Sequence, residues 1–248
     1  MPLMNKDTDM DPHQIAGSNF GFSAKRIDAL GAAEYTLVGI AADKSGSVRP
    51  FKSAIEDCIK AVVAACQRSP RVDNLMLRLT QFGDRVEETH GFKPLSECDP
   101  KSYADCLRPG GCTALFDAAT NMISSISQYG KSLTDSDFGV NAIVFVITDG
   151  ADNQSSFTAA SVKQALEQVI SGETVESMVS ILIGVNMQDA MISMYLNAFH
   201  RDAGFTQYVE LKDASSSTLA RLADFVSRSV SAQSQSLGTG GPSKALTF

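Results

Sequence analysis

Residues 141–150 read NAIVFVITDG, and the prediction of the fold starts from this segment. Every residue between Asn141 and Thr148 is apolar, and most are β-branched, which predicts a strand over 141–148. A continuous apolar run of this kind is typical of a strand buried on both faces, as in a parallel sheet covered by helices on each side. Asp149 and Gly150 follow directly and predict a turn at the carboxyl end of this strand.

Strand-like and helix-like segments alternate on both sides of this run. Upstream we expect a strand at 35–42, a helix at 51–69, a hairpin of strands 72–82 and 85–92, and a helix at 113–130 that ends at Gly130. Downstream we expect a helix at 157–172, a strand at 178–186, a helix at 189–204, a strand at 205–211 and a helix at 216–230. This order predicts a doubly wound α/β fold: a mostly parallel central sheet with one antiparallel edge strand and helices on both faces.

The chain divides by composition into three parts: an N-terminal arm at 1–33, one α/β domain at 34–231, and a flexible Ser/Gln/Gly-rich tail at 232–248. Residues 1–20 and the tail lack a periodic apolar face, so we expect both to be dispensable for stability. The segment 21–33 differs, because Phe22, Ile27 and Leu30 could dock on the sheet edge.

The bulk composition excludes several classes of protein. The 248 residues include 44% hydrophobic residues, which predicts a globular chain. The formal net charge of −7 argues against nucleic acid and against anionic membranes as partners. The first residues lack the apolar core of a signal peptide and no apolar run reaches membrane-spanning length, so we expect a cytoplasmic protein.

The histidines, cysteines and methionines are interpreted as structural or surface residues without a chemical role. The number of cysteines, five, is odd, and their spacing fits no disulfide framework, which favours a reducing compartment. A zinc set of His90, Cys98, Cys106 and Cys112 is an alternative, although its spacing matches no common zinc pattern. His90 and His200 are interpreted as surface residues. Four methionines are interpreted as core residues: Met178, Met187, Met191 and Met194.

Three turns at predicted strand ends carry oxygen-bearing side chains. The first turn contains Asp43, Ser45 and Ser47, the second places Thr113 after Gly110 and Gly111, and the third contains Asp149. In a parallel sheet these turns lie at the same carboxyl edge and can converge. Carboxylates and hydroxyls are hard ligands that suit Mg²⁺, which prefers six oxygens and usually keeps bound water. The sequence therefore predicts a magnesium site there, with Mn²⁺ or Ca²⁺ as alternative ions.

The three turns resemble the metal-ion-dependent adhesion site of von Willebrand factor A domains, in the pattern Asp43-x-Ser45-x-Ser47, then Thr113, then Asp149. The resemblance covers about 34–230 and extends to the order of the elements. It implies that Ser45, Ser47 and Thr113 bind the metal directly and that Asp43 and Asp149 bind it directly or through water.

The resemblance also implies a function. In that family a Glu or Asp from a partner protein completes the metal coordination, so the chain is expected to be a protein-interaction module and not an enzyme. Stand-alone bacterial and phage members of the family work inside cells as parts of larger assemblies. The rim that a partner would contact is expected at Lys44, Gly46, Asp152 and Asn153.

Other interpretations of the same residues stay open. Asp43, Ser45 and Ser47 could simply cap the following helix, and Asp117 is interpreted as a solvated helix residue. A Mg²⁺-dependent phosphohydrolase would need a second acid beside Asp43, where Lys44 and Ser45 stand. A structural component of a phage or other assembly is a further alternative, and the sequence does not decide the oligomeric state.

Overall fold

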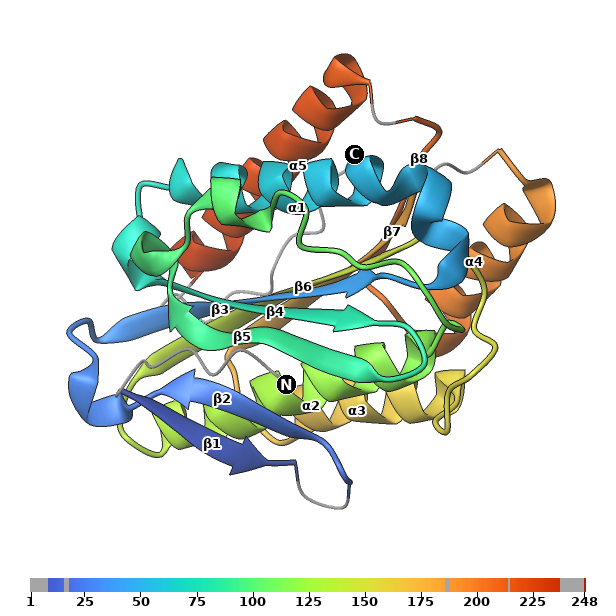
Figure 1. Cartoon of the computed structure of the whole chain (residues 1–248). Helices are drawn as coiled ribbons and strands as arrows, with labels where there is room; N and C mark the ends of the chain where they lie inside the picture. The colour runs from blue at the N-terminus through green and yellow to red at the C-terminus, as the bar shows by residue number, and fades with distance from the viewer. Residues whose placement is uncertain (1–8, 16–17, 186–187, 214, 237–247) are drawn as a thin grey trace.

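A computed structural model gives the fold of residues 9–15, 18–185, 188–213, 215–236 and 248 (Figure 1). The strands are β1 Met10–Gln14, β2 Gly21–Lys25, β3 Glu34–Asp43, β4 Leu75–Phe82, β5 Val86–Pro94, β6 Gly139–Thr148, β7 Ser177–Val185 and β8 Gln207–Leu211. The α-helices are α1 Lys52–Gln67, α2 Leu115–Thr134, α3 Ala159–Ser171, α4 Ala190–Ala203 and α5 Ser216–Ser236. None of the described helices is long and apolar enough to cross a membrane.

The strands form one sheet in the order β1-β2-β5-β4-β3-β6-β7-β8. Strands β4, β3, β6, β7 and β8 pair in parallel, and β5 runs antiparallel to β4. The predicted fold class, a doubly wound and mostly parallel α/β sheet, is therefore confirmed. The antiparallel β5 does not form the edge of the sheet, because β1 and β2 extend the sheet beyond it.

Strand β6 lies between β3 and β7 in the middle of the sheet, as its continuous apolar sequence predicts. Side chains alternate between two cores along it: Val144 and Val146 face one core, and Ile143, Phe145 and Ile147 face the other. The first core is covered by α2, α3 and α4, and the second by α1 and α5. Figure 1 shows α1 and α5 on one side of the sheet and α2 and α3 on the other.

The N-terminal arm is part of the sheet. Strands β1 and β2 form an antiparallel hairpin, and β2 joins β5 at the pair Ala24–Phe92. Phe22 docks on the sheet edge as expected, and Ile15 is also buried in the core formed with α2 and α3. The expectation that residues 1–20 are dispensable does not fit residues 10–15, whose mixed sequence has no apolar period but which pair with the neighbouring strand β2 and bury Ile15. Residues 1–8 lie outside the described part of the chain.

We expect Ile15→Ala to lower the free energy of unfolding by about 2–4 kcal/mol, because the side chain is only 6% exposed and its loss leaves a cavity. Gln14→Ala is the matched control, since Gln14 is exposed and directly precedes Ile15 at the end of β1. It should change stability by less than about 0.5 kcal/mol. Urea unfolding followed by circular dichroism measures both. Equal stability of the two variants would show that the hairpin does not pack on the domain.

Two helices end later than their sequences predict. Helix α2 passes through Gly130 and continues to Thr134. A Cβ at Gly130 would lie 2.8 Å from the Thr174 carbonyl oxygen, so this glycine permits a close contact between segments instead of ending the helix. Helix α5 continues to Ser236, so the boundary at 231 falls inside it. Gln233 is buried and donates to the carbonyl oxygen of Ala142 at 3.1 Å. Residues 237–247 of the predicted tail lie outside the described part.

Several of the interpretations of the methionines and histidines are wrong. Met191 and Met194 are 72% and 67% exposed and are not core residues; Met178 is partly buried against the core, and Met187 lies outside the described residues. His90 is not a surface residue, because its Nε2 lies 2.9 Å from the Tyr103 hydroxyl and burial lowers its pKa to about 4. The Nε2 atom of His200 is also buried, without a hydrogen-bond partner among the described residues.

Candidate functional site

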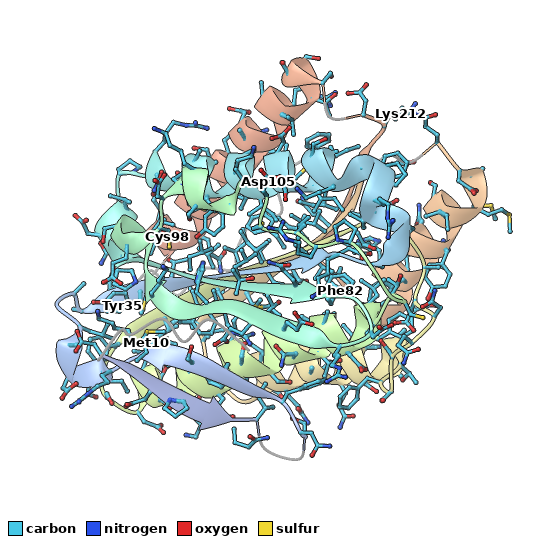
Figure 2. All side chains as sticks on the ribbon, in the orientation of Figure 1. Met10, Tyr35, Phe82, Cys98, Asp105 and Lys212 are labelled. Carbon is cyan, nitrogen blue, oxygen red and sulfur yellow. The ribbon has the colours of Figure 1, made fainter. Side chains whose placement is uncertain are left out.

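The candidate site lies where β3 and β6 end at the same edge of the sheet. The two strands pair in parallel up to Ala42 and Ile147, so the next residues, Asp43 and Thr148, come side by side. Figure 2 labels Phe82 at the carboxyl end of the neighbouring β4 and Tyr35 near the amino end of β3. The two labels show the two ends of the parallel strands. The Phe82 carbonyl oxygen accepts a hydrogen bond of 2.8 Å from the Lys44 amide, which ties the loop after β3 to β4.

Asp43 is the buried anchor of the site and is fully shielded from solvent. Its Oδ1 accepts a hydrogen bond of 2.7 Å from the Ser45 amide, and its Oδ2 accepts one of 2.6 Å from the Thr148 hydroxyl. Burial raises the pKa of this carboxyl to about 6, although the hydrogen bonds from Thr148 and Ser45 oppose the shift. Thr148 belongs to the site but is not among the residues predicted from the sequence. Its position at the end of β6, directly before Asp149, could have indicated its role.

A chain of hydrogen bonds links the first and third turns. The Ser45 and Ser47 hydroxyl oxygens lie 3.0 Å apart, and the Ser47 hydroxyl donates to Asp149 Oδ1 at 3.1 Å. Burial also raises the pKa of Asp149. Among the described residues, no positively charged group pairs with Asp43 or Asp149. The two carboxylates thus share a small region that lacks a compensating protein charge.

Thr113 reaches the same region from the second turn. It is 4% exposed, and with Ser47 and Asp149 it lines one pocket of about 490 Å³. No described residue forms a hydrogen bond with its hydroxyl. The second turn is held against the first by hydrogen bonds of 2.9 Å from the Gly46 amide to the Gly111 carbonyl and from the Gly110 amide to the Lys44 carbonyl. The structure therefore brings all five predicted metal ligands to one place.

The loop after β6 caps the N-terminus of α2, which has no capping side chain of its own. Asn153 Oδ1 accepts a hydrogen bond from the Thr113 amide at 2.8 Å, and Asp152 Oδ2 accepts one from the Phe116 amide at 3.1 Å. Ser155 Oγ accepts a hydrogen bond from the Asp117 amide at 3.0 Å. We call Asp152, Asn153 and Ser155 the α2 clasp. Through Asn153, it links Thr113 to the loop that follows Asp149.

The clasp changes the interpretation of three residues. Asp152 and Asn153 have a structural role in positioning Thr113, and their predicted contact with a partner stays a prediction. Asp117 is partly buried and accepts a hydrogen bond of 2.8 Å from the Phe157 amide, so it is not a freely solvated helix residue. These contacts join segments that are 36 to 40 residues apart in sequence.

We expect Asp152→Ala to lower the free energy of unfolding by about 1 kcal/mol, the usual effect of losing a helix cap. Because Thr113 then loses part of its support, Mg²⁺ affinity should fall by roughly tenfold, as for other residues that position metal ligands. Gln154→Ala is the matched control, since Gln154 is exposed in the same loop. Titration calorimetry checks both variants, and an unchanged Mg²⁺ affinity in Asp152→Ala would exclude a positioning role for the clasp.

The remaining residues of the predicted rim are held by other contacts. Lys44 Nζ forms an ion pair of 2.6 Å with Glu87 Oε2, and its side chain is 15% exposed. A Cβ at Gly46 would lie 3.2 Å from the Gly111 carbonyl oxygen, so a larger residue there would strain the contact between the first two turns.

The donor set fits a divalent cation. Two carboxylates in a buried region without a protein counter-charge would be stabilised by a dipositive ion, and hydroxyl oxygens from Ser45, Ser47 and Thr113 are neutral ligands of the kind Mg²⁺ accepts. Among the described residues, no group of three or more His, Cys, Asp or Glu side chains is placed to hold a metal, at this site or at any other. The zinc alternative therefore has no support, and the candidate site depends on two carboxylates and three hydroxyls.

Comparisons with known proteins found similar folds among solved structures. No protein-family model and no curated protein matches the sequence. Among solved structures, a von Willebrand factor type A protein from Catenulispora acidiphila has a TM-score of 0.57 at 12% identity, over 90% of this chain and 49% of that chain. A mutant of the PilB minor pilin from Streptococcus sanguinis has a TM-score of 0.57 at 14% identity, over 89% of this chain and 66% of that chain.

The pilus adhesin SpaC from Lactobacillus rhamnosus GG is also similar, with a TM-score of 0.55 at 11% identity, over 80% of this chain and 31% of that chain. The chain thus spans less than two thirds of the length of these three proteins. At such identities the likeness concerns the fold alone. The chain has a von Willebrand factor A-like fold, with the five candidate ligands at the carboxyl edge of its sheet.

Proposed function

We propose that this chain is a metal-dependent protein-interaction module that binds an acidic residue of a partner protein. One observation carries the proposal: Ser47, Thr113 and Asp149 line one pocket, hydrogen bonds connect Ser45 and Asp43 to this group, and no positively charged group of the described residues pairs with the two carboxylates. These side chains would hold Mg²⁺, or Mn²⁺ or Ca²⁺ in its place. The bound ion would supply an open coordination position for a carboxylate from outside.

The five proposed metal ligands would have different roles in binding. Asp43 and Asp149 balance the charge of the ion without leaving an excess negative charge that would repel an incoming carboxylate. Ser45 and Ser47 stand in one loop with their hydroxyls 3.0 Å apart, and Thr113 stands in another. The α2 clasp holds that second loop, so Thr113 would be oriented before the partner arrives. Such preorganisation reduces the cost of binding.

The same site gives little support to catalysis. A phosphohydrolase of this sheet type would need a second carboxylate beside Asp43, and Lys44 in that loop is engaged by Glu87. We therefore propose a binding module that is not an enzyme and that works within a larger assembly. Two of the structural neighbours are a pilus adhesin and a minor pilin, which is in keeping with an interaction role.

For the compartment we propose the cytoplasm. All five cysteines are free, and Cys58, Cys66 and Cys98 are buried as thiols. Burial raises the pKa of the Cys58 and Cys66 thiols to about 12, which keeps them protonated and unreactive. A reducing environment suits such a set.

Partner capture tests the proposal. The immobilised chain should retain a partner from its native extract in Mg²⁺ and release it in EDTA. Thr113→Ala should weaken partner binding more than Mg²⁺ binding, and Asp149→Ala should weaken both. Replacing the responsible Glu or Asp of the partner by Gln or Asn should cost about 2–5 kcal/mol. A complex that forms equally well in EDTA and with Asp43→Ala would contradict the proposal.

A further inference from the structure

The pocket at the candidate metal site contains an acidic residue that is not among the proposed metal ligands. Asp189 lines this pocket together with Thr113 and Asp149. Thr113 is 4% exposed, and no described residue forms a hydrogen bond with its hydroxyl. The volume of about 490 Å³ lies within the usual range for ligand pockets, about 300–1,000 Å³. Thr113 and Asp189 therefore border one space that a ligand could enter.

Only one oxygen of the Asp189 carboxylate is engaged within the described part of the chain. Asp189 is the N-cap of α4, and its Oδ1 accepts hydrogen bonds from the amides of Met191 at 2.8 Å and Ile192 at 3.4 Å. Among the described residues, its Oδ2 has no hydrogen-bond partner, and no Lys, Arg or His forms an ion pair with it. The N-terminus of a helix supplies only roughly half a positive charge. Negative charge therefore remains at this side of the pocket.

This charge is additional to the charge balance of the metal site. The two positive charges of a bound Mg²⁺ would be balanced by Asp43 and Asp149. An incoming carboxylate would then add a negative charge to a pocket that Asp189 already borders, and like charges in one interface disfavour binding. A ligand that brings a positively charged group together with its carboxylate would avoid this repulsion and could pair with Asp189.

The pocket also has an apolar side that suits a long basic side chain. Phe51, which directly precedes α1, and Ile192, in the first turn of α4, both line it. Lys and Arg carry a charged head on an apolar stem, and such stems commonly lie along apolar surfaces while the head reaches a polar group. A Lys or Arg of a ligand therefore matches this lining, with apolar residues beside its stem and Asp189 at its head.

We propose that the partner binds through a segment that carries a Lys or Arg within three residues of the Glu or Asp that reaches the metal. The basic side chain lies against Phe51 and Ile192 and donates to Asp189 Oδ2. Both residues of the ligand enter one pocket, and an extended chain advances about 3.3 Å per residue, so they must be close in sequence. The inference rests on the proposed metal-dependent function and specifies the class of partner.

A peptide selection tests this inference with the full-length chain. The probe is a displayed library of ten-residue peptides with one central Glu and all other positions random, selected in Mg²⁺ and eluted with EDTA. Compared with the unselected library, the enriched peptides should carry more Lys or Arg within three residues of the Glu. Synthetic copies of these peptides then serve for affinity measurements by fluorescence anisotropy.

Asp189→Asn removes the charge and keeps the cap of α4, because Asn caps helices as well as Asp does. Exchanging the selected Lys or Arg of a peptide for Met should weaken its binding to the unmodified chain roughly tenfold. The same exchange should cost less than about twofold with Asp189→Asn, because the charge pair is then absent in both peptides. Asp202→Asn is the matched control, since Asp202 is exposed near the opposite end of α4. It should behave as the unmodified chain does.

The outcomes separate the inference from the proposed function. Enriched peptides without a basic preference, or an equal effect of the exchange on Asp189→Asn and on the unmodified chain, overturn the inference and leave metal-dependent binding intact. In calorimetry, Asp189→Asn should keep the Mg²⁺ affinity of the unmodified chain, and a weaker affinity would overturn the inference because Asp189 would then act on the metal. The absence of any peptide that needs Mg²⁺ would overturn the proposed function as well.

Discussion

Replacing Asp43 by alanine is expected to abolish divalent-cation binding, with a loss in affinity of at least about 100-fold. The substitution removes a buried carboxylate that would hold the ion directly or through water. It also removes the acceptor for the Ser45 amide and the Thr148 hydroxyl, which lie 2.7 and 2.6 Å from its oxygens. The loop that carries Ser45 and Ser47 then loses the contact that sets its shape. Titration calorimetry with Mg²⁺ and Mn²⁺ measures the loss.

The control for this variant is Asp224→Ala, which removes an exposed carboxylate of α5 that is paired with Arg228. It should bind Mg²⁺ as the unmodified chain does. Circular dichroism should show that Asp43→Ala keeps its helical content, because α1 to α5 depend on the two cores and not on this side chain. A folded Asp43→Ala chain that binds Mg²⁺ with unchanged affinity would contradict the assignment of the site.

The second large effect is expected from Arg78→Met, which should lower the free energy of unfolding by about 3–5 kcal/mol. Arg78 is 1% exposed, and its Nε lies 2.8 Å from Glu88 Oε2. Its Nη1 donates to Asn121 Oδ1 at 2.9 Å and to Ser125 Oγ at 3.0 Å, both on α2. The substitution would leave the Asn121 and Ser125 acceptors without this donor, and Glu88 would lose its cationic partner while it keeps its hydrogen bonds from Ser23.

The same arginine connects the N-terminal hairpin to the domain. Its guanidinium lies 5.7 Å from the centre of the Phe22 ring, and Glu88 accepts a hydrogen bond of 3.0 Å from the Ser23 amide. Arg78→Met should therefore also loosen β2, which hydrogen exchange would detect as faster exchange at 21–25. The double variant Arg78→Met/Glu88→Leu should recover part of the stability, because the Glu88 carboxylate, whose side chain is 24% exposed, is then not left without its cationic partner.

Arg228→Met is the control for Arg78→Met. Arg228 pairs with Asp224 on the surface of α5, where both side chains are about half exposed or more. Its replacement should change stability by no more than about 0.5 kcal/mol. Urea unfolding measures all three variants. If Arg78→Met were as stable as Arg228→Met, the buried network would contribute nothing to the fold.

Local sequence patterns predict the middle of the sheet and the ends of its strands. The apolar run of β6 identifies a central strand because burial on both faces requires apolar residues throughout. The alternation of strands and helices then places Asp43 and Asp149 on one side of the sheet, because parallel strands end on the same side. Thr113 arrives differently: β5 runs antiparallel to β4 and ends on the opposite side, and the segment after Pro94 returns the chain to the site before α2 begins. The geometry agrees for all five candidate ligands, which line one pocket or are joined by hydrogen bonds.

The remaining features depend on tertiary contacts and strand pairing, which no apolar pattern in the sequence records. Strand β1 reads MDPHQ and is held by pairing with β2, not by an apolar period. Arg78 carries a charge, and charged side chains are usually exposed. Here Glu88, α2 and the hairpin enclose it. The α2 clasp joins Asp152 to Phe116 across 36 residues. Each of these features exists only once the chain has folded.

Anomalous diffraction from crystals soaked in Mn²⁺ tests the central claim most directly. Mn²⁺ takes the same hard oxygen ligands as Mg²⁺, and its anomalous signal locates the ion without assumptions about its ligands. We expect one strong peak per chain at the carboxyl edge of the sheet, bounded by the hydroxyl oxygens of Ser45, Ser47 and Thr113 and by the carboxylates of Asp43 and Asp149. A peak at another place on the chain, or no peak at this edge at saturating Mn²⁺, would contradict the claim.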